Sequence, residues 1–342
     1  SGGGIGVGLG QLSKRLARFS RFAKVGKCRA QEKQAFRRSF ATRIGLVIVI
    51  EHFDGRRRLF VVKPCTAEQI ARDLDKAWSI AEGDGGAPGP VYLEIPTDVL
   101  RQTVHPACVL EEHIAPKSRP RARPDVGVVS SAVALIRAAR RPLVVTGRGA
   151  RGTSAALTKL LGASGAVYLD TQESRGLVDG APAAVVGAVR ARAMQEADLV
   201  LVVGRKLDYQ MGYGSPAVFK QAKFVRIADH ADELRDNRRG EVELLADAGL
   251  AMAAIADALK APSPALDTAW TAALRAEHVK RAAKHAESMA FAPAGRDGHM
   301  HPNRIFAALR KVLAPDAITI ADGGDLLSFA RMGLETRHYL DA

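Results

Sequence analysis

The hydrophobic pattern of the chain is most regular between residues 125 and 260, where short apolar runs alternate with helical repeats. The runs are continuous and rich in Val and Leu, as expected for parallel strands that crossover helices bury on both faces. This pattern predicts a doubly wound parallel sheet in an α/β domain. The expected strands are 143–146, 167–170, 199–203, 224–228 and 242–245, and the expected helices are 126–140, 154–161, 186–197 and 249–259.

Shorter patterned segments flank this central region. A helical repeat over 70–81 leads through a Gly- and Pro-rich turn to a strand at 91–95. After the central region, the pattern predicts an Ala-rich helix over 267–289, a helix over 303–313 and a strand over 317–321. We expect the two flanking strands to lie in separate lobes, outside the central sheet.

Composition changes divide the chain into six segments. Four prolines with basic residues between them mark a solvated linker before the central region, and a second break follows it. The expected segments are a basic stretch of unclear fold (1–60), the end of a first domain (61–105), a linker (106–124), the central domain (125–260), a linker and helix (261–300) and the start of a third domain (301–342).

The positive charge of the chain is concentrated at its beginning. The formal net charge is +14, but residues 1–60 contain 14 Lys and Arg against 3 Asp and Glu. Such a segment could bind polyanions, although few aromatic residues are interleaved with the basic ones. We therefore interpret it as a disordered or misassigned leader and disfavour a nucleic-acid partner.

Two other classes of protein are disfavoured by composition. The longest early apolar run, 46–50, is far shorter than the roughly 18 residues of a membrane span, so we expect no membrane partner. The three cysteines are widely spaced and form no metal or disulfide pattern. This favours a reducing, cytoplasmic environment, and no metal ligand is assigned.

A glycine-rich turn follows the first central strand. Gly147, Arg148, Gly149 and Gly152 match the G-x-G-x-x-G pattern, and Asp170 ends the next strand. Glycines permit close approach of a phosphate, and an acid at this distance can bind a ribose. Alternatively, the turn has glycines because any tight strand-to-helix turn favours them.

The strand at 91–95 carries the most specific motif. Residues 89–100 read G-P-V-Y-L-E-I-P-T-D-V-L, which resembles the end of the pyrimidine-binding domain in thiamine-diphosphate-dependent decarboxylases and carboligases. The central segments 174–177, 197–208 and 212–214 resemble the middle domain of the same family, nearest to acetolactate synthase-like proteins, oxalyl-CoA decarboxylase and 2-hydroxyacyl-CoA lyase.

The resemblance implies two sets of binding residues. The middle domain of relatives binds FAD, ADP or nothing, and Arg190, Arg205 and Asp229 lie where relatives can contact such a nucleotide, beside the turn at 147–149. His301-Pro302 and the segment 322–325 resemble the opening of the diphosphate-binding domain. Gly323 and Gly324 would allow close approach of the diphosphate of thiamine diphosphate, and Asp325 would cap the following helix.

The resemblance also implies what the chemistry requires. The family uses thiamine diphosphate with Mg²⁺, an activating glutamate, and 2-keto acid or acyl-CoA substrates, in homodimers or tetramers. Its metal-binding segment and its glutamate have no counterpart in this chain. Glu51 lies too close to Gly89 to be that glutamate, so no catalytic residue is assigned. We expect a fragment that is inactive alone.

Three other functions remain open at this point. The central sheet could be a non-catalytic module that binds ADP or FAD. The basic segment 1–60 could bind nucleic acid. A hydride-transferring NAD enzyme is the third possibility, although no convincing His and Asp pair supports it.

Overall fold

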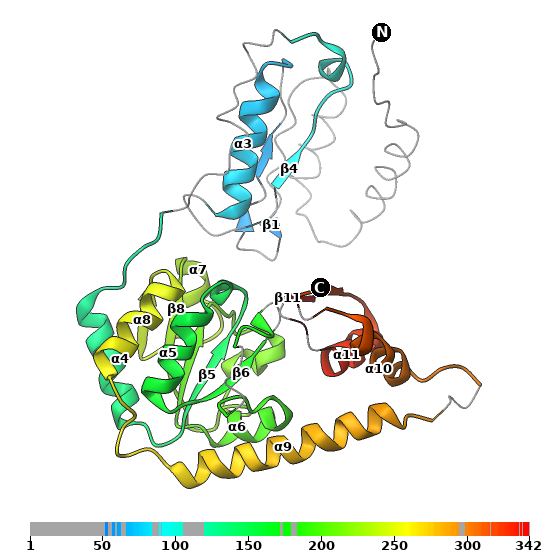
Figure 1. The fold of residues 1–342 in the computed structure, drawn as a ribbon. Coiled ribbons are helices and arrows are strands. Elements are labelled where there is room, and N and C mark those ends of the chain that lie inside the picture. The colour runs from blue at the N-terminus through cyan, green and yellow to red at the C-terminus, as the bar shows by residue number, and fades with distance from the viewer. Residues whose placement is uncertain are drawn as a thin grey trace. The chain divides into compact units, whose positions relative to one another are not determined.

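In the computed structural model the chain folds into two compact units. The units are Ser1–Lys117 and Ser118–Ala342 (Figure 1). Glu51 and most of the basic segment lie outside the described residues. The structure describes residues 52–53, 57–58, 60–62, 66–83, 89, 91–104, 120–171, 174–178, 183–293, 298–314, 316–334, 336 and 338–341.

The first unit pairs short strands beside one helix. Strands β1 (His52–Phe53) and β2 (Arg57–Arg58) are antiparallel, and β3 (Phe60–Val62) is parallel to β4 (Val91–Leu93). Helix α3 (Gln69–Glu82) ends at Gly83, whose φ of 86° is left-handed and suits glycine. A β-α-β arrangement of this kind agrees with the helix and strand expected from the sequence.

A five-stranded parallel sheet forms the centre of the second unit, as predicted. Its strand order is β6-β5-β7-β8-β9. The strands are β5 (Pro142–Thr146), β6 (Val167–Asp170), β7 (Leu199–Val203), β8 (Lys223–Ala228) and β9 (Val242–Leu245). Every residue of β5 and β7 is buried, which explains why these strands are continuous apolar runs.

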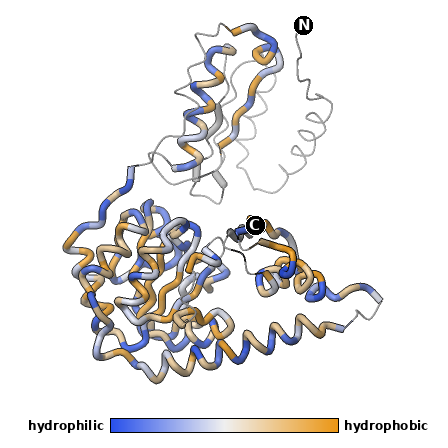
Figure 2. Tube along the Cα trace, viewed as in Figure 1, coloured by the Kyte–Doolittle hydropathy of each residue, from blue (hydrophilic) through white to orange (hydrophobic). Residues whose placement is uncertain are grey.

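Helices cover both faces of this sheet. One apolar core lies under α4 (Val126–Ala138), α5 (Ser154–Ser164) and α8 (Ala248–Leu259). The other lies under α6 (Arg190–Glu196) and the start of α9 (Thr268–Ala290). The hydrophobic colouring is concentrated in the strands and the inward faces of these helices (Figure 2). The predicted α/β fold class is thus confirmed.

Most predicted elements agree with the structure within a few residues, but the helix expected over 186–197 is too long. Gly187–Val189 forms a 3₁₀ turn, and α6 begins only at Arg190. Val189 has a non-helical φ of −123°, so the apolar repeat there reflects burial of Val186 and Val189 and not continuous helix. A short helix, α7 (Ala231–Leu234), follows β8.

The last part of the second unit has a small core of its own. It contains α10 (Pro302–Val312), β10 (Ile318–Ala321), α11 (Gly324–Gly333) and β11 (His338–Asp341), with β10 and β11 parallel. Met289 at the end of α9 packs with Phe306, Ala330 and Leu334. Neither β4 nor β10 joins the five-stranded sheet, as expected for strands outside the central domain.

Candidate functional site

The carboxyl edge of the central sheet has a switch point between β5 and β7. These strands are neighbours, yet the chain leaves β5 toward α5 on one face of the sheet and leaves β7 toward the 3₁₀ segment Tyr209–Gly214 on the other face. Open parallel sheets usually bind their ligands at such a switch point. The residues that follow β5, β7 and β8 include five of the six nucleotide contacts predicted from the sequence.

The glycine turn after β5 is interlocked with the loop after β7. A Cβ atom on Gly204, whose φ is +55°, would lie 2.4 Å from Gly149 Cα, and one on Gly147 would lie 2.6 Å from Gly204 O. Gly147 N donates to Val203 O at 3.0 Å and Gly149 N to Gly204 O at 2.9 Å. These glycines therefore have a packing role, and both amides are used inside the fold.

The turn also does not lead directly into a helix. Arg148–Ala150 forms a 3₁₀ turn, Gly152 is left-handed, and α5 begins at Ser154. Asp170 Oδ2 accepts a hydrogen bond from Gly176 N at 3.3 Å. The local geometry thus accounts for the glycines without a dinucleotide, and nothing about it favours a hydride-transfer enzyme.

Arg205 lies beneath this edge with only 2% of its side chain exposed. Its Nη1 and Nη2 donate to Asp208 Oδ2 and Oδ1 at 2.8 and 3.0 Å, and Nη2 also donates to Gln210 Oε1 at 3.1 Å. Nη1 further donates to Lys206 O. Buried bidentate pairs of this kind are strong and geometrically specific. Both Nη atoms of Arg205 are therefore engaged with the loop after β7.

Arg190, the first residue of α6, is exposed at the same edge. Its Nη2 donates to Gln210 O at 3.3 Å. Partial desolvation and then the charge of Arg205 lower the pKa of Arg190, while Asp170 raises it and Arg331 lowers it. Because the Arg190 guanidinium is exposed and positively charged, it could bind an anion at this edge.

Arg148 and Asp229 lie at the same edge of the sheet, after β5 and β8, and both are exposed. Asp229 Oδ1 is 3.8 Å from His230 Nε2, and Glu233 Oε2 is 3.5 Å from the same nitrogen. Burial, and then the charges of Asp229 and Asp236, raise the pKa of Glu233 to about 7, although Arg226 and Arg148 oppose this rise.

A buried ion pair that the sequence did not predict supports the loops of this edge. Arg226 on β8 pairs with Asp236, and their side chains are 1% and 3% exposed. Arg226 Nη2 also donates to Glu233 O at 2.7 Å, while Asp236 Oδ2 accepts from Leu207 N at 2.7 Å. An arginine within an otherwise apolar strand was the signal that could have revealed this pair, because buried arginines require partners.

The three predicted diphosphate contacts lie together at the start of α11. Gly323 and Gly324 have φ values of +84° and +45°, and a Cβ on either would meet nothing within 4 Å. Open left-handed glycines before a helix N-terminus can receive a phosphate. The expected cap is wrong, however, because Gly323 occupies the N-cap without a side-chain hydrogen bond, and Asp325 lies in the first turn.

These residues fit thiamine diphosphate only in part. The backbone at 323–324 suits a diphosphate, and the described ranges contain no group of three or more His, Cys, Asp or Glu that could hold a metal ion. Within those same ranges, no helix has the length and apolar character needed to span a membrane. The binding of Mg²⁺ and a cytoplasmic location stay predictions.

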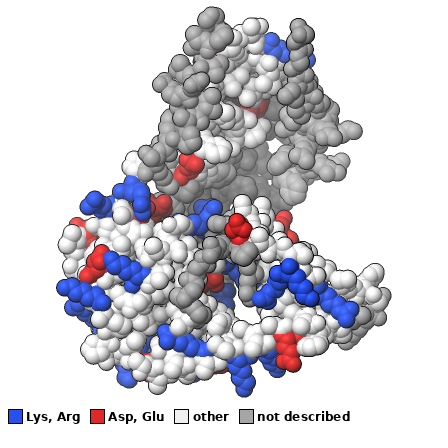
Figure 3. All heavy atoms as spheres, viewed as in Figure 1, with Lys and Arg blue, Asp and Glu red and all other residues white. Residues whose placement is uncertain are grey.

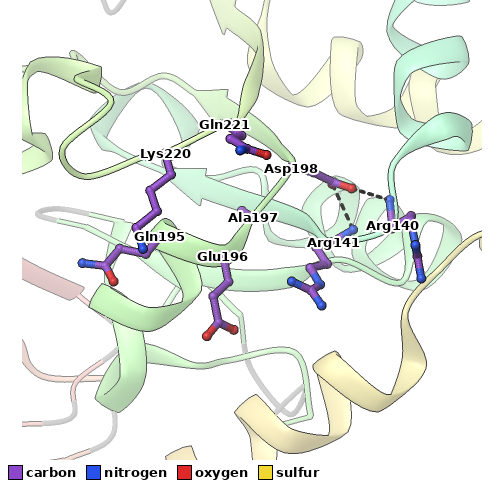
Figure 4. A pocket seen from close by; sticks show the side chains of 8 residues that line it. All are labelled: Arg140, Arg141, Gln195, Glu196, Ala197, Asp198, Lys220 and Gln221. Carbon is purple, nitrogen blue, oxygen red and sulfur yellow. Dashed lines mark hydrogen bonds between the residues drawn. The ribbon is translucent and has the colours of Figure 1, made fainter.

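A cavity of about 460 Å³ lies at the opposite, amino edge of the sheet (Figure 4). Asp198 Oδ2 and Oδ1 accept from Arg140 N and Arg141 N at 2.8 and 2.9 Å. Helices α4 and α6 both end here, and cations near helix C-termini are stabilising. The Arg and Lys side chains that line the cavity therefore have a structural explanation.

On the face drawn in Figure 3, basic and acidic side chains are interspersed.

The sequence of the central domain matches a known family. Residues 129–255 match the model described as "Thiamine pyrophosphate enzyme, central domain", and these residues span the sheet and its helices from α4 to α8. The chain is related to the thiamine pyrophosphate enzymes. The predicted resemblance to thiamine-diphosphate-dependent enzymes is thereby confirmed at the level of the family, over residues 129–255.

Individual relatives extend this similarity to both sides of the central domain. The chain is 30% identical over 290 residues to 2-hydroxyacyl-CoA lyase of Arabidopsis thaliana and 27% identical over 292 residues to 2-hydroxyacyl-CoA lyase 1 of Mus musculus. These alignments cover 80% and 83% of this chain and 49% of each relative. Oxalyl-CoA decarboxylase of Escherichia coli (strain K12) is 25% identical over 207 residues, 60% of this chain and 37% of that protein.

The chain thus spans about half the length of the lyases that it matches. The relatives carry the names of lyases and a decarboxylase of CoA thioesters, which agrees with the expected class. In a thiamine pyrophosphate enzyme, the glycine turn after β5 belongs to the central domain, so it needs no dehydrogenase to explain it.

Proposed function

We propose that this chain is part of a thiamine-diphosphate-dependent lyase, of the acetolactate synthase-like class, that acts on an acyl-CoA substrate. The match of residues 129–255 to the central domain of the family carries this proposal. Similarity to 2-hydroxyacyl-CoA lyases over four-fifths of the chain favours a CoA thioester over a free 2-keto acid.

When bound, thiamine diphosphate supplies both the nucleophile and the electron sink for cleavage beside a carbonyl group. The contribution of this chain would be to hold the cofactor. The left-handed glycines at 323 and 324 leave the backbone open to the diphosphate, and the N–H groups at the start of α11 favour negative charge there. Asp325 would orient the helix or a bound cation and would not attract the diphosphate itself.

Calorimetry with thiamine diphosphate, with and without Mg²⁺, tests this assignment. We expect weak binding to the full 342-residue chain and its loss in a Gly324→Val variant, because a side chain at this left-handed position would cover the open backbone. Gly298→Val is the matched control, since Gly298 is also left-handed with open space around it but precedes α10. Equal binding by all three proteins would contradict the assignment.

We also propose that the 342-residue chain does not turn over substrate by itself. Its described residues include no metal-holding group, and the activating glutamate expected of the family has no counterpart among them. Purified protein incubated with thiamine diphosphate, Mg²⁺ and oxalyl-CoA or a 2-hydroxyacyl-CoA should release no product above background. Measurable turnover would refute this part of the proposal.

A second candidate function is binding of the nucleotide part of CoA, ADP or FAD at the carboxyl edge. Arg148, Arg190 and Asp229 are exposed there on three converging loops, and this favours an anionic ligand with hydroxyl groups. Titration with ADP, CoA and FAD tests it. Arg148→Ala and Arg190→Ala should weaken binding, whereas Arg140→Ala, an exposed arginine at the amino edge, should not. Equal effects of all three variants would indicate non-specific attraction.

A further inference from the structure

The loop after β7 adopts a backbone conformation that it would not favour alone. Gly212, Tyr213 and Gly214 are left-handed in succession, with φ values of 54°, 54° and 67°. Tyr213 and Lys260 are the only non-glycine residues with positive φ in the part of the chain that the structure describes. Left-handed backbone is unfavourable for a residue with a Cβ, and 54% of Tyr213 is exposed, so its own packing compensates little.

Contacts at both ends hold the loop in this conformation. At its far end, Arg238 Nη1 donates to Gly214 O at 2.8 Å. At its start, Asp208 O accepts from Tyr213 N at 2.8 Å, and Asp208 Oδ1 accepts from Gln210 N at 3.0 Å. Asp208 therefore anchors the start of the loop. A residue that holds the Asp208 side chain in place also stabilises the loop conformation.

Arg205 contacts the side chains of both Asp208 and Gln210. Its guanidinium makes a bidentate pair with Asp208 and a third contact with the Gln210 side chain. The side chain is 2% exposed, and its Nε is buried without a hydrogen-bond partner among the described residues. Because the guanidinium is enclosed and both Nη atoms are engaged within the loop, its geometry favours a supporting role over contact with a ligand.

The same loop contacts Arg190 through the main chain. Gln210 O accepts from Arg190 Nη2 at 3.3 Å, while Gln210 Oε1 accepts from Arg205 Nη2 at 3.1 Å. One residue thus links a buried arginine to an exposed one. Asp208 pairs with Arg205, but the charge of Arg205 still lowers the pKa of Arg190.

We propose that Arg205 is a positioning residue: by fixing Asp208 and Gln210, it holds the Gln210 carbonyl where it orients the Arg190 guanidinium at the carboxyl edge. This rests on the proposed binding of a nucleotide at that edge, and it reassigns Arg205 from a ligand contact to a support. The loop after β7 is then a part of the binding site whose shape depends on a buried ion pair.

A double-mutant cycle with ADP as the ligand separates positioning from direct contact. Arg190→Ala should weaken ADP binding by roughly tenfold, the size of one lost charge-assisted hydrogen bond. Arg205→Met should weaken it several-fold in the parent protein and hardly at all in the Arg190→Ala background, because Arg205 acts through Arg190. Equal losses in both backgrounds would mean that Arg205 contacts the ligand directly and would overturn the proposal.

Variants of Gln210 avoid the risk that Arg205→Met fails to fold. Gln210→Ala leaves the Arg205–Asp208 pair intact and should weaken ADP binding and speed amide exchange of residues 209–214. Gln210→Glu restores an acceptor for Arg205 and should recover both properties. If Gln210→Ala changes neither affinity nor exchange, the positioning role is wrong.

The outcome for the proposed nucleotide site is distinguishable from the outcome for Arg205. If the parent protein binds neither ADP nor CoA, the nucleotide site is refuted, and with it the role of Arg205 in orienting Arg190 for a ligand. Amide exchange in Arg205→Met then still decides whether Arg205 fixes the loop. Faster exchange over 209–214 with an unchanged urea midpoint would retain that structural role alone.

Discussion

The carboxyl group of Glu233 should make the central unit less stable as the pH rises toward neutrality. The Glu233 side chain is 14% exposed, and its Oε1 has no hydrogen-bond partner among the described residues. Burial raises its pKa from 4.5 to about 7. The folded protein therefore holds this proton more tightly than the unfolded chain does. Its stabilising contribution is complete below pH 4.5 and is lost as the pH rises from 4.5 to about 7.

The size of the effect follows from the same shift. A rise of the pKa from 4.5 to about 7 corresponds to about 3 kcal/mol of stability lost between those pH values. Glu233→Gln removes the charge while keeping the shape of the side chain. Relative to the parent protein, the free energy of unfolding of the variant should be higher by up to about 3 kcal/mol at pH 8 and nearly unchanged at pH 4.5.

Urea denaturation followed by tryptophan fluorescence measures this difference. Trp270 is 4% exposed and donates through Nε1 to Glu196, whereas Trp78 in the first unit is 66% exposed. The signal should therefore report mainly on the second unit. Asp232→Asn, on the exposed side of α7, controls for the change in net charge and should show no such pH dependence. A gain of equal size at pH 4.5 and pH 8 would refute the reasoning.

Three further changes should separate packing, pairing and capping, each measured as a change in the urea midpoint. Gly204→Ala should cost several kcal/mol, because its Cβ would clash with Gly149, whereas Gly152→Ala should cost only about 1 kcal/mol for its left-handed φ, since nothing lies within 4 Å. Asp236→Asn should cost about 3 kcal/mol by leaving buried Arg226 unpaired. Asp247→Ala should cost about 1 kcal/mol, because Asp247 caps α8 by accepting from Leu250 N. Similar costs for the two glycine variants, or no cost for Asp236→Asn, would contradict the respective argument.

The fold of the central domain could be predicted because strands that are buried on both faces have continuous apolar sequences. β6, β7 and β9 have the bounds expected from the sequence, and β7 is a continuous apolar run that is buried at every residue. The prediction of a helix over 186–197 was partly wrong because the apolar spacing there was ambiguous. Val186 and Val189 are buried by a 3₁₀ turn, and an apolar spacing of three residues fits such a turn as well as a helix.

The buried polar contacts that stabilise the candidate site could not be predicted, because they form between residues that are not neighbours in the sequence. Arg226 and Asp236 are ten residues apart and meet only when the segment after β8 folds back over the sheet. Ser174 was noted as part of a family motif. In the structure it is buried, and its hydroxyl donates to Thr146 O at 2.9 Å and accepts from Thr171 N at 3.0 Å. A sequence motif identifies such residues without revealing what they hold.

The glycine turn shows how one pattern can have two physical causes. A phosphate and a crossing backbone both require that no Cβ be present, so Gly147 and Gly149 alone cannot distinguish them. The deciding signal is Gly204, a third glycine directly after the neighbouring strand. Here the segments that follow β5 and β7 contact each other directly through their main chains, so the glycines at their starts reflect backbone packing at the switch point. Recognition of a nucleotide at this edge would then depend on the side chains of Arg148, Arg190 and Asp229, and substitutions there should change affinity while leaving the interlocked glycines, and hence the sheet, intact.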